Sequence, residues 1–194
     1  YARRDARRHE HFIGGDPHEE ASDLDYFVWL VRNAKRTFVI DTGFSEGVGR
    51  KRNRFLLREP VAGLRALGVD AATVRDVIIT HMHYDHLGNF KQFPQARYHL
   101  QDAEMNYATG RHMTHNIFSH PYEVDEVCDL VRCVHQGRVL FHDGDEELAP
   151  GISVHRIGGH TMGIQSVRVR TKIGWIVLAS DATHFYANME EVKP

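Results

Sequence analysis

Four side chains that can ligate a metal ion lie within six residues, in the sequence HMHYDH from His81 to His86. This segment directly follows Val77–Thr80, a short apolar run that predicts a strand. If the strand continued, His81 and His83 would share one face, because side chains alternate with a period of two. A turn into a helix would let Asp85 and His86 reach a second point. Neutral imidazole and carboxylate bind zinc, and also iron or manganese. The segment therefore predicts two adjacent metal positions.

A complete metal site needs ligands from other strand ends, and two candidates fit. His160 lies in the sequence GGHTMG at Gly158–Gly163, where the glycines let the backbone turn sharply. Asp181 lies just past an apolar run at 175–179 that predicts a strand. A bridging carboxylate can hold two cations ~3.5–4 Å apart. We expect His160 and Asp181 to complete the site.

The composition is that of an ordinary globular protein. Hydrophobic residues make up 42% of the 194 residues and charged residues 26%, which excludes an intrinsically disordered chain. The 24 basic and 26 acidic residues give a net charge of −2, without the basic excess typical of nucleic-acid-binding proteins. No apolar run approaches the ~20 residues that cross a bilayer, and no signal-peptide pattern opens the chain. We therefore expect a cytoplasmic protein without a nucleic-acid or membrane partner.

The two cysteines do not offer a metal site or a disulfide. Cys128 and Cys133 lie five residues apart in a segment that predicts a helix, so their side chains point in different directions. We expect both to be small apolar residues on or near a core face. Histidine, which occurs 15 times, is the common metal ligand that remains.

The elements that must position these side chains form a mixed α/β or α+β pattern. We expect one domain over residues 1–194, incomplete at both ends, since the chain begins at Tyr1 and ends at Pro194. Asp102 is expected to cap its helix, residues 47–49 and 142–151 to be loops, and Phe27 and Trp29 to lie in the core. The predicted strands are 26–31, 36–40 (a hairpin with the first), 77–80, 97–100, 139–141, 152–157, 166–170 and 175–179. The predicted helices are 60–67, 102–107 and 123–134.

The order HxHxDH, then GHTxG, then an aspartate at a strand end resembles the metallo-β-lactamase superfamily. The resemblance runs from the strand pair that ends at Asp41–Thr42–Gly43 to Asp181. Within that superfamily the chain looks most like the branch of the N-acyl homoserine lactonases and 4-pyridoxolactonase. The resemblance implies an αβ/βα sandwich with the metals at one edge, here apparently lacking its C-terminal segment.

The resemblance also implies a ligand set and a cofactor, namely two zinc ions, with iron, manganese or cobalt as alternatives. Asp41 would orient the ligands. The family supplies a further histidine ligand from a C-terminal segment, whereas the only histidine here after Asp181 is His184. The implied ligands are His81, His83 and His160 for one metal and Asp85 and His86 for the other, with Asp181 bridging.

The activity that the resemblance implies is the opening of a lactone ring, most simply an N-acyl homoserine lactone, by a hydroxide that bridges two metals. Asp85 would take the proton of the water and return it to the leaving oxygen. Many homoserine lactonases place a tyrosine shortly after the bridging aspartate, a role that His184 or Tyr186 would fill here as a hydrogen-bond donor to the oxyanion. The partner would be a small-molecule lactone, and a homodimer is the assembly that the branch suggests.

Two alternatives to a homoserine lactonase stay open at this point. One is another hydrolase of the same fold, acting on a 4-pyridoxolactone-type lactone, a thioester, a β-lactam or a phosphoester. The other is a catalytically silent domain that binds a metal or a ligand. Its support is the missing C-terminal ligand.

Overall fold

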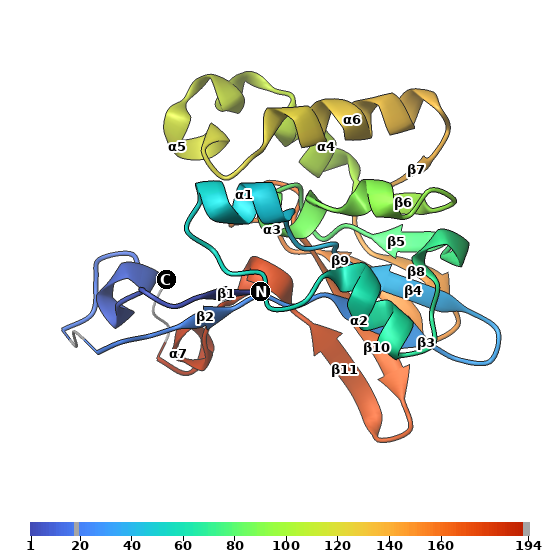
Figure 1. Ribbon diagram of the computed structural model, residues 1–194, viewed down its shortest axis with the longest axis horizontal. Helices are drawn as coiled ribbons and strands as arrows, with labels where there is room; N and C mark the ends of the chain where they lie inside the picture. Colours follow the sequence, from blue (N-terminus) through green and yellow to red (C-terminus); the bar gives the residue numbers. More distant parts are fainter. Residues whose placement is uncertain (18–19, 192–194) are drawn as a thin grey trace.

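Two β-sheets face each other in the computed structural model, which describes residues 1–17 and 20–191 (Figure 1). In the five-stranded sheet, β3 pairs antiparallel with β4, and the remaining neighbours are parallel. Its strands, in spatial order, are β3 (Trp29–Arg32), β4 (Thr37–Ile40), β5 (Asp76–Ile78), β6 (Arg97–Gln101) and β7 (Val139–His142). The four-stranded sheet is antiparallel, in the order β11 (Gly174–Leu178), β10 (Gln165–Thr171), β9 (Ile152–Arg156) and β8 (Glu146–Ala149).

Alternating side chains on the five-stranded sheet build two separate cores. Phe38, Ile40 and Ile78 pack against residues of the four-stranded sheet, among them Val154 and Val167. The intervening residues Val39 and Val77 point to the opposite face and pack in a larger cluster with the helices. Strands that are apolar on both faces belong in the middle of a layered fold. The five-stranded sheet is accordingly the central layer.

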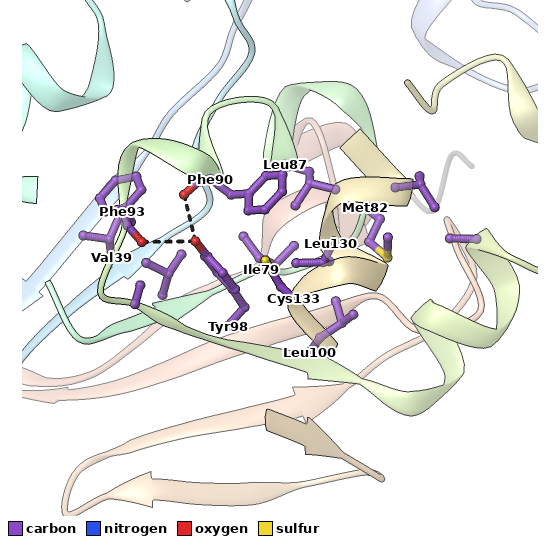
Figure 2. Packing of buried hydrophobic residues seen from close by; sticks show 14 of the residues in the cluster. Val39, Ile79, Met82, Leu87, Phe90, Phe93, Tyr98, Leu100, Leu130 and Cys133 are labelled. Carbon is purple, nitrogen blue, oxygen red and sulfur yellow. Dashed lines mark hydrogen bonds between the residues drawn. The ribbon is translucent and has the colours of Figure 1, made fainter. Parts of the chain in front are cut away.

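Helices cover the outer face of this central sheet. Leu64 of α2, Tyr107 of α4 and Leu130 of α6 all join its buried cluster. Figure 2 shows that cluster, in which the hydroxyl of Tyr98 donates hydrogen bonds to the carbonyls of Phe90 (2.9 Å) and Phe93 (3.2 Å). The helices are α1 (Glu46–Lys51), α2 (Pro60–Ala66), α3 (Tyr84–Leu87), α4 (Asp102–Ala108), α5 (Asn116–Ser119), α6 (Val124–His135) and α7 (Tyr186–Glu190). None of the helices in the described part of the chain is long and apolar enough to cross a bilayer.

The N-terminal segment and α7 lie together at one end of the molecule (Figure 1). Strands β1 (Ala2–Arg3) and β2 (Leu24–Asp25) form a small antiparallel pair. The rings of His11 and Phe185 lie 4.7 Å apart between their centroids. The segment that follows Asp181 is therefore packed against residues from the start of the chain.

The strands and the three longer helices are confirmed, with ends shifted by a few residues, and the mixed α/β class holds. Two elements contradict the predicted loops. Helix α1 contains Gly47 and Gly49, and the Ser45 hydroxyl caps it by accepting a hydrogen bond from Val48 N (3.3 Å). Strand β8 lies inside the expected 142–151 loop and is fixed by pairing with β9.

Three finer predictions were wrong. Asp102 is the first residue of α4 rather than its N-cap, a place where its charge still favours the helix dipole. Cys133 is buried as expected, but Cys128 is exposed, because α6 turns Val127 and Leu130 toward the core instead. Phe27 and Trp29, expected in the core, are 61% and 45% exposed and lie outside it.

Candidate metal centre

The carboxyl ends of β4 and β5 bring the first group of functional side chains to one edge of the sheet. The two strands are parallel neighbours, so the residues that follow each strand lie side by side, as at the ligand sites of parallel sheets. Asp41, directly after β4, donates its backbone N–H to the carbonyl of Ile78, the last residue of β5 (2.8 Å). The HMHYDH segment continues from there into α3. Asp41 therefore lies beside the segment that carries the predicted ligands.

Residues of the four-stranded sheet complete the same edge. His160 follows β9, and Asp181 follows β11. Gln165, at the start of β10, ties the two sheets together here. Its backbone N–H donates to the carbonyl of Thr80 (3.0 Å) and its side-chain amide to that of Ile79 (2.8 Å). The strand ends of both sheets are thus held at one place.

The structure brings together three imidazoles, those of His81, His83 and His160. Nδ1 of His83 lies 3.0 Å from Nε2 of His81 and 3.0 Å from Nε2 of His160. Burial lowers the pKa of all three, and the neighbouring imidazoles lower it further. The lowered pKa values favour the neutral form, which has nitrogen lone pairs available in a space that suits one metal ion.

The carboxylate of Asp181 lies between this group and His86. Its Oδ1 is 3.3 Å from His86 Nε2, and its Oδ2 is 3.4 Å from His160 Nε2 and 3.9 Å from His81 Nε2. Although burial raises the pKa of Asp181, His86 and His184 lower it well below its usual range. The carboxylate is thus ionised. One oxygen faces His86 and the other faces His160 and His81, the arrangement that a bridging ligand needs.

The surroundings of the buried Nε2 atom of His86 show whether these residues suit a metal ion. Nδ1 of the same ring lies 2.7 Å from Asp41 Oδ2, whereas Nε2 has no hydrogen-bond partner within the described ranges. Burial acts to lower the pKa of His86, but the carboxylates of Asp181, Asp41 and Asp85 raise it well above its ordinary value. The surroundings of Nε2 therefore stabilise positive charge, and nitrogen and carboxylate donors are those that zinc, iron and manganese prefer. The residues fit a metal ion.

The carboxylate of Asp85 lies near His86 but farther from it than the carboxylate of Asp181 does. Its Oδ2 is 3.7 Å from His86 Nε2. Burial raises the pKa of Asp85 to about 6, and the nearby charge of Asp181 adds to this while that of His86 opposes it. The three sets of candidate ligands whose atoms lie within 4.8 Å of one another do not include Asp85. Its predicted role as a ligand of the second metal stays a prediction.

Of the two residues predicted to act on the oxyanion, the structure brings one to the site. His184 Nε2 lies 3.0 Å from Asp181 Oδ2 and forms a third candidate ligand set with Asp181 and His160. The hydrogen bond to Asp181 raises the pKa of His184. Tyr186 is 77% exposed and does not line the cavity over the histidines. The geometry therefore favours His184 for that role.

Strained backbone marks two positions at this edge. Asp41 has a φ of +59° and Ser180, next to Asp181, a φ of +51°, values in the left-handed region that L-residues seldom adopt. The hydroxyl of Thr80 connects them, 2.8 Å from Asp41 Oδ2 and 2.8 Å from Ser180 Oγ. Strain of this kind persists where the surroundings hold it and is common at functional sites.

A cavity of about 540 Å³ lies over the histidines. His83, Asp85, His86, His160, Asp181 and His184 line its polar part. Its apolar lining includes Phe27, Trp29, and Ile176 and Val177 of β11. Sequence reasoning missed this apolar lining. The run YFVWLV could have indicated it. Val28 and Leu30 pack inward, and side chains alternate along a strand, so Phe27 and Trp29 face outward.

Comparison with known proteins places these features in a family. The model of the metallo-beta-lactamase superfamily matches residues 22–193. An N-acyl homoserine lactonase of Bacillus sp is 25% identical over 190 residues, which cover 90% of this chain and 70% of the relative. The N-acyl homoserine lactonase AiiB of Agrobacterium fabrum is 27% identical, over 86% of this chain and 66% of the relative. The chain thus spans about two thirds of the length of these relatives.

Solved structures share the fold. The crystal structure of a quorum-quenching N-acyl homoserine lactone lactonase superposes with a TM-score of 0.79 at 21% identity, over 100% of this chain and 78% of that one. A dizinc quorum-quenching lactonase, AidC, superposes with a TM-score of 0.61 at 18% identity, over 82% of this chain and 57% of that one. At these identities the likeness concerns the fold, which agrees with the two facing sheets and the site at their shared edge.

Proposed function

Because the chain belongs to the metallo-β-lactamase superfamily, we propose that it is a metal-dependent hydrolase that opens lactone rings, with N-acyl homoserine lactones as its substrate class. The observation that carries the proposal is the placement of Asp181 between His86 and the imidazoles of His81 and His160, in the lining of a cavity that also has apolar side chains. The related lactonases named above support the choice of substrate class.

The ligand arrangement that we propose uses two metal positions. His81, His83 and His160 would hold one ion, and His86 with Asp85 the other, with Asp181 between them. Two zinc ions are the proposed occupants, with iron, manganese or cobalt as alternatives. When bound, such ions would polarise the ester carbonyl and lower the pKa of a water molecule.

The remaining chemistry falls to side chains of this protein. Asp85 is buried at the cavity, where its carboxylate oxygens would accept the proton of the attacking water and return it to the oxygen of the leaving alcohol. His184, whose protonated form is favoured by Asp181, would donate a ring N–H to the oxygen of the attacked carbonyl.

The shape of the cavity agrees with a substrate that has a polar ring and an apolar tail. The lining combines polar side chains, among them the histidines and Asp181, with apolar ones, namely Phe27, Trp29 and Ile176. A lactone ring bound at the former would direct an acyl chain along the latter. Apolar walls with few polar groups are usual for small-molecule sites.

The test is metal analysis followed by hydrolysis assays on the same sample. We expect two zinc, iron or manganese ions per chain. We also expect hydrolysis of N-acyl homoserine lactones, measured as the acid that ring opening releases. The panel should also contain a pyridine-fused lactone, a thioester, a chromogenic β-lactam and a phosphodiester. A preference for one of these four compounds over the homoserine lactones would replace the proposed substrate class. A metal-loaded protein that hydrolyses no compound of the panel would contradict the hydrolase assignment.

A further inference from the structure

Glu104, on α4, is a fully buried carboxylate (0% exposed) that the proposed chemistry does not use. Four hydrogen-bond donors surround it. Its Oε1 accepts from the backbone N–H of Met82 (2.9 Å) and from the hydroxyl of Tyr122 (3.2 Å). Its Oε2 accepts from the hydroxyl of Thr161 (2.5 Å) and from the backbone N–H of Gly163 (3.2 Å). Every side of the carboxylate is thus occupied by a donor.

Three of these donors, Met82, Thr161 and Gly163, lie in the segments that carry the clustered imidazoles, and the fourth, Tyr122, contacts one of these rings. Met82 lies between His81 and His83 in the chain, and Thr161 directly follows His160. The ring of Tyr122 packs edge-on against that of His83, with 4.7 Å between centroids. One carboxylate therefore holds the HMHYDH segment and the GGHTMG loop, which are about 80 residues apart in the chain, at a common point.

The backbone packing around Gly163 supports the same connection. A Cβ added to Gly163 would lie 2.0 Å from the backbone nitrogen of Glu104 and 2.4 Å from its Cα. No side chain fits at that distance, so the GGHTMG loop rests directly on α4 only because residue 163 is glycine. The final glycine of the motif is thus explained by contact with the helix that carries Glu104.

The charge of Glu104 matters as much as its position. All four neighbours present an N–H or O–H group, and an ionised carboxylate can accept from all of them. An amide in its place would turn an NH₂ group toward two of these donors. Burial raises the pKa of Glu104, and the hydrogen bonds from Thr161 and Met82 act in the opposite direction.

We propose that Glu104 is a positioning residue, which fixes the HMHYDH segment against the GGHTMG loop so that His81, His83 and His160 are preorganised for a metal ion. The proposal rests on the proposed function in one respect, that these three histidines hold a metal. Groups that orient metal ligands through hydrogen bonds commonly change metal affinity 10–100-fold when removed. Here the effect passes through two backbone segments.

The experiment compares Glu104→Gln with Glu147→Gln. Glu147, on β8, also accepts a backbone N–H, from Gly151 (3.0 Å), but its side chain is exposed. We would measure zinc affinity by competition with a chromogenic chelator, the visible spectrum of the cobalt-loaded protein, and thermal unfolding of the metal-free protein. For Glu104→Gln we expect zinc affinity lowered about 10–100-fold and an altered cobalt spectrum, and for Glu147→Gln wild-type values.

Wild-type affinity and spectrum in folded Glu104→Gln would overturn the positioning role while leaving the proposed function intact. A wild-type protein that binds no metal would overturn both. If Glu104→Gln does not fold, Tyr122→Phe and Thr161→Val each remove one donor from the carboxylate. A several-fold loss of zinc affinity in both would support the proposal, and unchanged affinity in both would overturn it.

Discussion

Nδ1 of His86 lies 2.7 Å from Oδ2 of Asp41, although 45 residues separate the two in the chain. The same carboxylate accepts hydrogen bonds from the backbone N–H (2.7 Å) and the hydroxyl (2.8 Å) of Thr80. A proton on Nδ1 that is donated to Asp41 leaves Nε2 directed at Asp181 (3.3 Å). Through this contact Asp41 would set which nitrogen of His86 is offered to a metal, the orienting role that the family resemblance implies.

We expect Asp41→Asn to lower the affinity for the second metal ion about 10–100-fold. An amide keeps only one acceptor oxygen, so either Thr80 or His86 loses its partner. Chelator competition followed by elemental analysis would measure the loss. Asp70→Asn is the matched control, because Asp70 accepts a backbone N–H from Ala72 (3.0 Å) on the exposed surface. Equal metal affinity in Asp41→Asn and the wild type would contradict the orienting role.

Asp85→Asn should lower turnover far more than substrate binding. An amide cannot take the proton of the attacking water, and positioned general bases contribute about 10²–10⁴-fold to rate. We therefore expect kcat to fall by about 10²-fold or more while KM changes little. The rates must be compared at matched metal content, since Asp85 is also a predicted ligand. Unchanged kcat in a metal-loaded variant would rule out the proton transfer.

The roles of His184 and Tyr186 can be separated with one pair of variants. His184→Phe removes a ring nitrogen that lies 3.0 Å from Asp181, and we expect kcat to fall about 10²–10³-fold, as for loss of an oxyanion donor. Tyr186→Phe removes a hydroxyl from an exposed side chain, and we expect a much smaller effect. The reverse ranking would assign the donor to Tyr186. A lower metal content in His184→Phe would instead make His184 a ligand.

The strands were predictable because short apolar runs such as Val77–Ile79 are typical of buried strands in a globular protein. Helix α1 was not, because Gly47 and Gly49 disfavour helices. The structure shows why Gly49 is tolerated: a Cβ there would lie 2.8 Å from the ring of Phe44 and 3.1 Å from the carbonyl of Arg54. Helix α1 therefore depends on tertiary packing, which a local sequence pattern does not reveal. Strand β8 was missed for a similar reason, since Glu146 and Glu147 become a strand only by pairing with β9.

Much of the candidate site was predictable from residue types, but its geometry was not. A shared strand face for His81 and His83 required the strand to continue through them, and β5 ends at Ile78. They meet instead in the loop that follows, where Met82 is buried in the core between them. The partners of Glu104 were likewise hidden, since its contact with Thr161 spans 57 residues. Long-range contacts of this kind depend on the whole fold.

The apolar lining of the cavity should select for acyl chain length. Trp29→Ala removes a large side chain from the lining of the cavity that the histidines also line, and losing most of an aromatic contact costs about 1–3 kcal/mol. We expect kcat/KM for long-chain lactones to fall about 10-fold or more, with little change for short-chain lactones. Ile173→Ser, at an exposed turn outside the cavity, is the control. An equal loss for short and long chains would mean that Trp29 does not contact the tail.

The last prediction concerns stability and a group away from the metal centre, Glu126 of α6. Its Oε2 is buried with no hydrogen-bond partner among residues 1–17 and 20–191. Burial, with some contribution from Glu123, raises the pKa of Glu126 from 4.5 to about 8. Across that interval the folded protein keeps a proton that the unfolded chain releases, so this residue makes stability fall as the pH rises.

Glu126→Gln abolishes the ionisation and should therefore stabilise the metal-free protein increasingly as the pH rises from about 4.5 to about 8. We expect little difference from the wild type at the lower pH and a gain of about 1 kcal/mol or more at the higher one, since a buried group without its partner costs about 1–3 kcal/mol. Urea unfolding at both pH values measures this. Asp125→Asn, one residue earlier and exposed, should change stability by less than about 0.5 kcal/mol. A gain for Glu126→Gln that is equal at both pH values would show that the benefit does not come from removing a buried charge.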